Sequence, residues 1–216
     1  MPTLVLMRHG EAGFAARDRA RPLTPRGREE AASQARAIRR VVGDIDVAIV
    51  SEATRTRQTL AALRSAGLAV ARVREEASLY SRGGEGLLEA LRGMGRGEIE
   101  SAAPGADGAW QADVTRESLD AREAYGAESG AGADAVLVVG HEPTMSTLAG
   151  LLATREKDLH ESQGRAPFRA LRGAGATRAD HSFRHGFSTA MAVVGHVESW
   201  SSLAPGCMRI ADVLRP

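Results

Sequence analysis

The sequence predicts an α/β protein of three layers, in which helices cover both faces of a mostly parallel sheet. Short apolar runs that are typical of strands buried on both faces recur along the chain. Most of these runs alternate with stretches of helical periodicity. The 216 residues are 43% hydrophobic and 25% charged, which is enough apolar material for one core. We therefore expect a single domain over residues 1–216.

The expected strands are apolar runs separated by polar or helical stretches. They lie at residues 3–7, 46–50, 68–73, 135–143, 187–196 and 207–214. The first run ends at Arg8, His9 and Gly10, and the fourth runs into Gly140 and His141. Polar residues therefore stand where two of the buried strands are expected to end.

The clearest helix is expected between residues 24 and 43. Thr24 can cap its N-terminus and Pro25 suits its first position, while Gly43 is a natural stop. Apolar residues within it recur at helical spacing and form one stripe: Ala31, Ala35, Ile38 and Val42. Further helices are expected at 51–67, with Gly67 as the stop, at 85–94 and at 144–153.

Two stretches are expected to be insertions in the domain. Residues 95–134 are rich in Gly, Ala, Asp and Glu, and residues 155–185 lack a long apolar stripe. The second stretch carries seven Lys and Arg against four Asp and Glu. Structureless loops of this length are usually disordered or functional. Residues 155–185 are thus either a surface excursion or a basic lid near a site.

Composition narrows the classes of function. The formal net charge of +1 argues against a general nucleic-acid-binding surface. A single cysteine, Cys207, excludes an intrachain disulfide and a cysteine-based zinc site. His181 and His185 have i, i+4 spacing but lie where helical periodicity is lacking, so we expect no metal. Neither a signal peptide nor a membrane-spanning run is recognisable, so we expect a cytoplasmic protein without membrane contact.

Four residues suited to phosphate chemistry follow the expected strands. Arg8 and His9 end the first strand, Arg55 lies about one turn into the helix after the second, and His141 ends the fourth. The carboxyl ends of parallel strands meet at one edge of a sheet, where sites form. An arginine fork binds phosphate oxygens and a histidine can act as a nucleophile. Their convergence predicts a phosphate site that contains a nucleophile.

Several motifs, in this order, resemble the histidine phosphatase superfamily: "RHGEA", "RPLTPRGREEA", "SEATRTRQT" and "VGHEP". The "RPLT" element, "GFSTAMAVV" and the ending "IADVLRP" resemble its SixA-type phosphohistidine phosphatase branch. The resemblance implies a phosphoglycerate mutase-like fold and a reaction that needs no metal or cofactor. It also implies that His9 becomes phosphorylated, that Arg8, Arg55 and His141 complete the phosphate pocket, and that Arg21 is a further contact.

The proton donor is less well marked in the sequence. Many members of the family use a carboxylic acid to protonate an alcohol leaving group, and Glu85 is the candidate from its place in the chain. Glu85 can equally be a glutamate favoured by the start of a helix. A histidine leaving group needs less help from an acid, so phosphohistidine is favoured over a sugar phosphate. Glu11 is a second carboxylate expected near the site.

The expected function is therefore hydrolysis of a phosphoryl group carried by a phosphorylated protein, through a phosphohistidine on His9. One alternative is a general phosphomonoesterase or mutase-like enzyme that acts on small phosphate esters. Another is a non-catalytic module that binds phosphorylated partners. The presence of His9 together with Arg8, Arg55 and His141 argues against a pure binding module, which has no need of a nucleophile.

Overall fold

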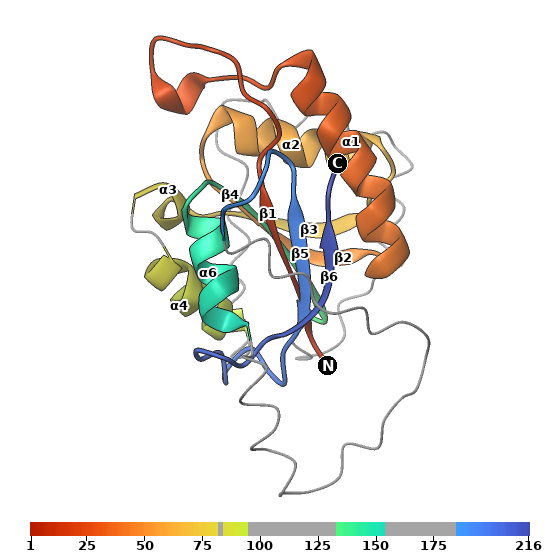
Figure 1. Cartoon of the computed structure of the whole chain (residues 1–216), viewed down its shortest axis with the longest axis vertical. Helices are drawn as coiled ribbons and strands as arrows, with labels where there is room; N and C mark the ends of the chain where they lie inside the picture. The colour runs from red at the N-terminus through yellow and green to blue at the C-terminus, as the bar shows by residue number, and fades with distance from the viewer. Residues whose placement is uncertain (82–83, 95–132, 154–184) are drawn as a thin grey trace, which may run out of the picture.

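The computed structural model describes residues 1–81, 84–94, 133–153 and 185–216 (Figure 1). The two expected insertions, with the possible lid over residues 155–185, lie almost entirely outside these described residues. Within the described part, six strands form one sheet in the order β3-β2-β4-β1-β5-β6. The strands are β1 (Thr3–Arg8), β2 (Ile45–Val50), β3 (Val70–Glu75), β4 (Ala135–Gly140), β5 (Ala192–His196) and β6 (Arg209–Leu214).

The sheet is mostly parallel, as predicted. β1 pairs in parallel with β4, β4 with β2, and β2 with β3. β5 is antiparallel to both of its neighbours, β1 and β6. The described helices are α1 (Pro25–Val41), α2 (Thr54–Ser65), α3 (Ser78–Ser81), α4 (Gly84–Met94), α6 (Thr144–Leu152) and a 3-10 helix, η1 (Asp18–Ala20).

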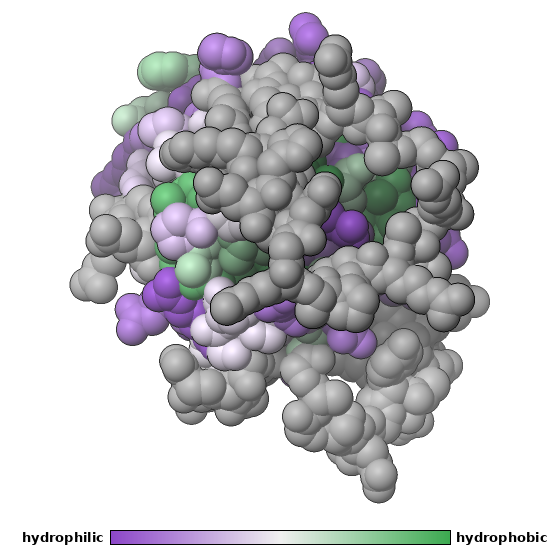
Figure 2. Space-filling view, turned by 60° about the horizontal axis from the view of Figure 1, so that its bottom comes forward, coloured by the Kyte–Doolittle hydropathy of each residue, from purple (hydrophilic) through white to green (hydrophobic). Residues whose placement is uncertain are grey.

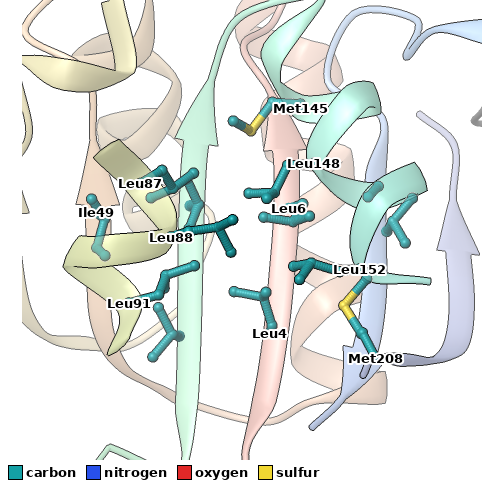
Figure 3. Close-up of a cluster of buried hydrophobic side chains, with 14 of the residues drawn as sticks. Leu4, Leu6, Ile49, Leu87, Leu88, Leu91, Met145, Leu148, Leu152 and Met208 are labelled. Carbon is teal, nitrogen blue, oxygen red and sulfur yellow. The ribbon is translucent and has the colours of Figure 1, made fainter. Parts of the chain in front are cut away.

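Helices cover both faces of the sheet, because successive side chains of each strand point to opposite faces. Val5 and Met7 of β1 pack in the cluster that includes Ile38 of α1 and Leu60 of α2. On the other face, Leu4 and Leu6 lie against α4 and α6 (Figure 3). The helical side chains of that cluster include Leu87, Leu88, Leu91, Met145, Leu148 and Leu152. The three-layer α/β/α fold is thus confirmed.

α1 is built as its sequence predicts. The hydroxyl of Thr24 accepts a hydrogen bond from the backbone N–H of Gly27 at 3.0 Å, which caps the helix. Its buried face includes Ala31, Ala35 and Ile38. Gly43 and Gly67, the predicted stops after α1 and α2, have φ of 91° and 92°, a conformation that favours glycine.

The largest difference from the predicted elements is the late strand at 187–196. β5 begins only at Ala192, because the preceding residues turn around the end of β1. The backbone N–H of Arg8 donates to the carbonyl of Met191, and that of Ala190 donates to the carbonyl of His9. This turn brings residues 187–191 to the carboxyl end of β1.

The first turn of α1 also lies against the carboxyl end of β1. A Cβ atom built on Gly10 would collide with the backbone of Gly27, and one built on Gly27 would collide with that of Glu11. The N–H of Gly10 donates to the hydroxyl of Thr59 in α2 at 3.1 Å. The backbone after β1 is therefore held between two helices, which fixes where His9 lies.

None of the helices within the described residues is long and apolar enough to cross a membrane. Figure 2 views the end of the molecule from which β1 starts, and the described side chains visible there are a mixture of hydrophilic and hydrophobic ones.

Candidate active site

The candidate site lies where the three central strands β2, β4 and β1 end. Arg8 is in register with Gly140, so His9 and His141 follow the ends of neighbouring strands. Ser51 follows the adjacent β2. After β1 the chain enters α1 on one face of the sheet, and after β4 it enters α6 on the other. Ligands of open α/β sheets bind at such a switch point.

His9 is buried, with 9% of its surface exposed, and both of its ring nitrogens have partners. Nδ1 lies 2.7 Å from the carbonyl oxygen of Gly10. A carbonyl oxygen only accepts, so Nδ1 carries the proton and Nε2 has a free lone pair. Nε2 accepts a hydrogen bond at 3.2 Å from Nε of Arg55. The nitrogen that can act as a nucleophile therefore faces an arginine.

Arg55 lies in the first turn of α2 and is 6% exposed. One edge of its guanidinium contacts His9, and the remaining nitrogens bind Asp18. The distances are 2.7 Å to the backbone carbonyl and 3.0 Å to Oδ2 of Asp18. The contacts with Asp18 fix the planar guanidinium, and its Nε faces Nε2 of His9. The group therefore lies beside the nitrogen that would carry a phosphoryl group.

His141 contributes the second imidazole. Its ring centroid lies 5.2 Å from that of His9, with 63° between the ring planes. Nε2 of His141 is 2.9 Å from the hydroxyl of Ser51, and its buried Nδ1 has no hydrogen-bond partner among the described residues. The ring of Tyr80 packs edge-on against His141 at 5.5 Å.

The other arginines predicted at the site differ in position. Arg8 donates through Nη1 to the carbonyl of Phe187 at 2.6 Å, and its buried Nε has no partner in the described part of the chain. Arg21 instead binds the loop before α1, through the carbonyls of Gly13 and Ala12. It also donates to Oδ1 of Asp18 at 3.2 Å. Arg21 is therefore linked to Arg55 through Asp18.

The two carboxylates expected near the site are those of Glu11 and Glu85, and the structure describes the side chain of Glu11 only. Glu11 accepts a hydrogen bond from the hydroxyl of Thr24 at 2.8 Å, so it secures the start of α1. Glu85 lies in the first turn of α4, but its side chain is outside the described part of the structure. Its role as a proton donor stays a prediction.

Burial and positive charge keep both histidines neutral. Desolvation by burial lowers the pKa of His9 from 6.5 to about 4, aided by the charges of Arg55, Arg8 and Arg21 and opposed by the hydrogen bond to Gly10. Burial, together with the charge of Arg55, lowers the pKa of His141 to about 3. At neutral pH the lone pair of His9 is therefore available.

Asp18 is ionised at neutral pH. The hydroxyl of Tyr80 donates to its Oδ2 at 2.7 Å. That hydrogen bond, followed by those from Arg21 and Arg55, lowers the pKa of Asp18 to about 2. Five side chains thus form a closed ring, in the order His9, Arg55, Asp18, Tyr80 and His141.

Sequence reasoning missed two members of this ring, Asp18 and Tyr80. Asp18 stands three residues before Arg21, and an acidic residue at that spacing from a predicted site arginine is the signal that could have marked it. Tyr80 carried no signal, because it reaches the site from α3, a single turn of helix that periodicity cannot reveal. Arg19 stacks over the ring of Tyr80 at 4.7 Å and pairs with Glu52 at 2.7 Å.

The histidine titrations give a direct test of this electrostatic environment. We expect the imidazole signals of His9 and His141 to titrate with midpoints near 4 and 3 in the free protein. Long-range ¹H–¹⁵N spectra recorded from pH 2 to 8 should show His9 with its proton on Nδ1 at pH 7. A midpoint near 6.5 for His9 would contradict the arrangement.

Taken together, the site is a cluster of basic side chains around a neutral histidine at the carboxyl edge of an α/β sheet, an arrangement suited to phosphoryl groups. The family model described as histidine phosphatase superfamily (branch 1) matches residues 4–165. The chain belongs to the histidine phosphatase superfamily, and its fold is like that of phosphoglycerate mutase. Membership implies an enzyme of the phosphatase or mutase class.

Solved structures of similar fold include SixA proteins. One from Nakamurella multipartitia, provisionally assigned as phosphohistidine phosphatase SixA, is 29% identical with a TM-score of 0.66, covering 100% of this chain and 96% of that one. Another, from Agrobacterium tumefaciens and with the same provisional assignment, is 22% identical with a TM-score of 0.56, covering 99% and 98%. The protein histidine phosphatase SixA complexed with tungstate is 17% identical with a TM-score of 0.60, covering 99% and 96%. A search of curated proteins found no match.

Within the described residues, no group of three His, Cys, Asp or Glu side chains is arranged to hold a metal ion. In that part of the chain, the positive charges that lower the pKa of His9 are those of Arg55, Arg8 and Arg21.

Proposed function

We propose that the protein is a phosphohistidine phosphatase of the SixA type, which hydrolyses its substrate through a covalent phosphohistidine on His9. The observation that carries the proposal is the state of His9. Its Nδ1 proton is held by the carbonyl of Gly10, and its Nε2 lone pair is directed at Arg55. That geometry supports attack by Nε2 on phosphorus.

In the first step, Nε2 of His9 forms a bond to phosphorus while the bond from phosphorus to the leaving group breaks. The electron pair of that bond goes to the leaving atom. Arg55 and Arg8 neutralise the charge on the equatorial oxygens, and the neutral His141 can donate a hydrogen bond to one of them. The proton on Nδ1 of His9 stays in its hydrogen bond to Gly10.

In the second step, water attacks the phosphorus of phosphorylated His9. The bond from phosphorus to Nε2 breaks, its electron pair returns to Nε2, and inorganic phosphate leaves. The released proton passes to the phosphate or to solvent. His9 regains the neutral state that its surroundings favour.

The ionised carboxylate of Asp18, next to Arg55, favours phosphohistidine over a phosphate ester as the substrate. An alkoxide leaving group needs a proton from a neutral acid, and the carboxylate that lies against Arg55 is ionised. An imidazole that is protonated on its second nitrogen leaves as a neutral molecule. The similarity to the Nakamurella protein, which is provisionally assigned as a phosphohistidine phosphatase, supports the same substrate class.

A substrate panel tests the proposed function. The wild-type protein should turn over a phosphohistidine peptide with a kcat/KM at least about tenfold above that for p-nitrophenyl phosphate or 3-phosphoglycerate. Phosphate release is measured for each substrate at pH 7. Turnover of the esters alone would make the protein a phosphomonoesterase or mutase. Phosphate binding without any turnover would make it a binding module.

A further inference from the structure

Asp18 differs from the other members of the ring in its exposure to solvent. His9, Arg55 and His141 are each less than one tenth exposed. The side chain of Asp18 is 50% exposed. A phosphoryl group that reaches Nε2 of His9 must leave the rest of its carrier molecule on the solvent side. Asp18 is therefore the member of the ring that is most open to a group on the solvent side.

Asp18 also retains capacity to accept a hydrogen bond. A carboxylate has about four acceptor sites. Within the described residues, Oδ2 accepts from Arg55 and Tyr80, and Oδ1 accepts from Arg21. These bonds hold the carboxylate in place while its other side faces solvent. Asp18 is thus a fixed negative charge in contact with two arginines of the site, Arg55 and Arg21.

We propose that Asp18 is a specificity-determining residue that accepts a hydrogen bond from the protonated second ring nitrogen of a phosphohistidine substrate. The inference rests on the proposed function and names the feature of the leaving group that the site recognises, a cationic N–H. The same charge disfavours substrates that carry a carboxylate next to their phosphate, because like charges repel at close range.

The contact has a consequence for the first chemical step. A phosphorylated imidazole leaves well only when its second nitrogen carries a proton, because it then departs as neutral imidazole. The carboxylate of Asp18 favours that protonated form and raises the pKa of the bound imidazole. Asp18 takes up no proton itself. The bond broken is that between phosphorus and the imidazole nitrogen, which keeps the electron pair.

Asp18→Asn tests the inference, because it keeps the size and an acceptor oxygen but removes the charge. We expect kcat/KM for a phosphohistidine peptide to fall roughly tenfold relative to kcat/KM for p-nitrophenyl phosphate, and kcat/KM for 3-phosphoglycerate to rise relative to that same reference. The alkaline limb of the phosphohistidine pH–rate profile should move to lower pH by about one unit. A purely structural role would not move that limb.

Glu52→Gln is the matched control. Glu52 follows Ser51 and pairs with Arg19, so this change removes a carboxylate near the same ring without altering the ring itself. It should leave both the substrate ratio and the pH profile unchanged. Thermal melting of each variant shows that the fold is retained.

The outcomes separate this inference from the proposed function. Equal losses on all three substrates, or an unchanged ratio with an unchanged alkaline limb, would overturn the role of Asp18 while leaving phosphohistidine turnover intact. A wild-type protein that hydrolyses the esters but not phosphohistidine would instead overturn the proposed function, and the inference with it. A selective loss on phosphohistidine with a shifted limb supports the role.

Discussion

His9→Ala is expected to abolish turnover, with kcat falling by at least about 10⁴-fold, as is typical when a covalent nucleophile is removed. No other imidazole in the described residues combines a carbonyl acceptor at one nitrogen with an arginine at the other, as His9 does. His141 has neither of these contacts, since the partner of its Nε2 is the hydroxyl of Ser51. The loss should appear with every substrate, since all share the phosphoryl acceptor.

The measurement is the trapping of ³²P from a labelled phosphodonor, with an alkaline quench that preserves bonds between phosphorus and nitrogen. The wild-type protein should label transiently and His9→Ala should not. His196→Ala is the matched control, since His196 lies in β5 opposite Thr3, at the far end of β1 from the site. It should label like the wild type. Label retained by His9→Ala would show that the phosphoryl group goes to another residue.

The central part of the fold could be predicted because its signals are local. The apolar runs that became β1, β2 and β4 are buried on both faces, and such runs are distinctive. The start of α1 is marked by Thr24 and Pro25. Because the three strands are parallel neighbours, their ends had to bring His9, Arg55 and His141 to one edge.

The solvent side of the site could not be predicted in this way. Asp18 reaches Arg55 only because the loop between β1 and α1 folds back over α2. Arg21 stabilises that loop through the carbonyls of Ala12 and Gly13. The contact between Asp18 and Arg55 joins segments far apart in sequence, and those of Arg21 lie within an irregular loop, so no periodic pattern records either kind. The same holds for Tyr80, whose position depends on how α3 packs.

Arg55→Lys is expected to lower kcat about 10²- to 10³-fold, which corresponds to roughly 3–4 kcal/mol of transition-state stabilisation. Lysine keeps the positive charge but offers one nitrogen in place of a planar fork. It cannot contact Nε2 of His9 and also the backbone carbonyl and Oδ2 of Asp18, as Arg55 does. The phosphoryl group would be held less precisely for in-line attack.

Arg57→Lys on the same helix is the control for this change. Arg57 pairs with Glu75 at 2.6 Å and takes no part in the ring around His9. The Arg57→Lys variant should therefore keep kcat within about threefold, as expected for a substitution away from the reacting groups.

Steady-state kinetics of Arg55→Lys give kcat and KM separately. Because the fork acts most strongly on charge that develops in the transition state, the loss in Arg55→Lys should fall mainly on kcat. A variant that changed KM alone would show that Arg55 binds the substrate and its transition state equally well, and that positioning by the fork contributes little to the chemical step.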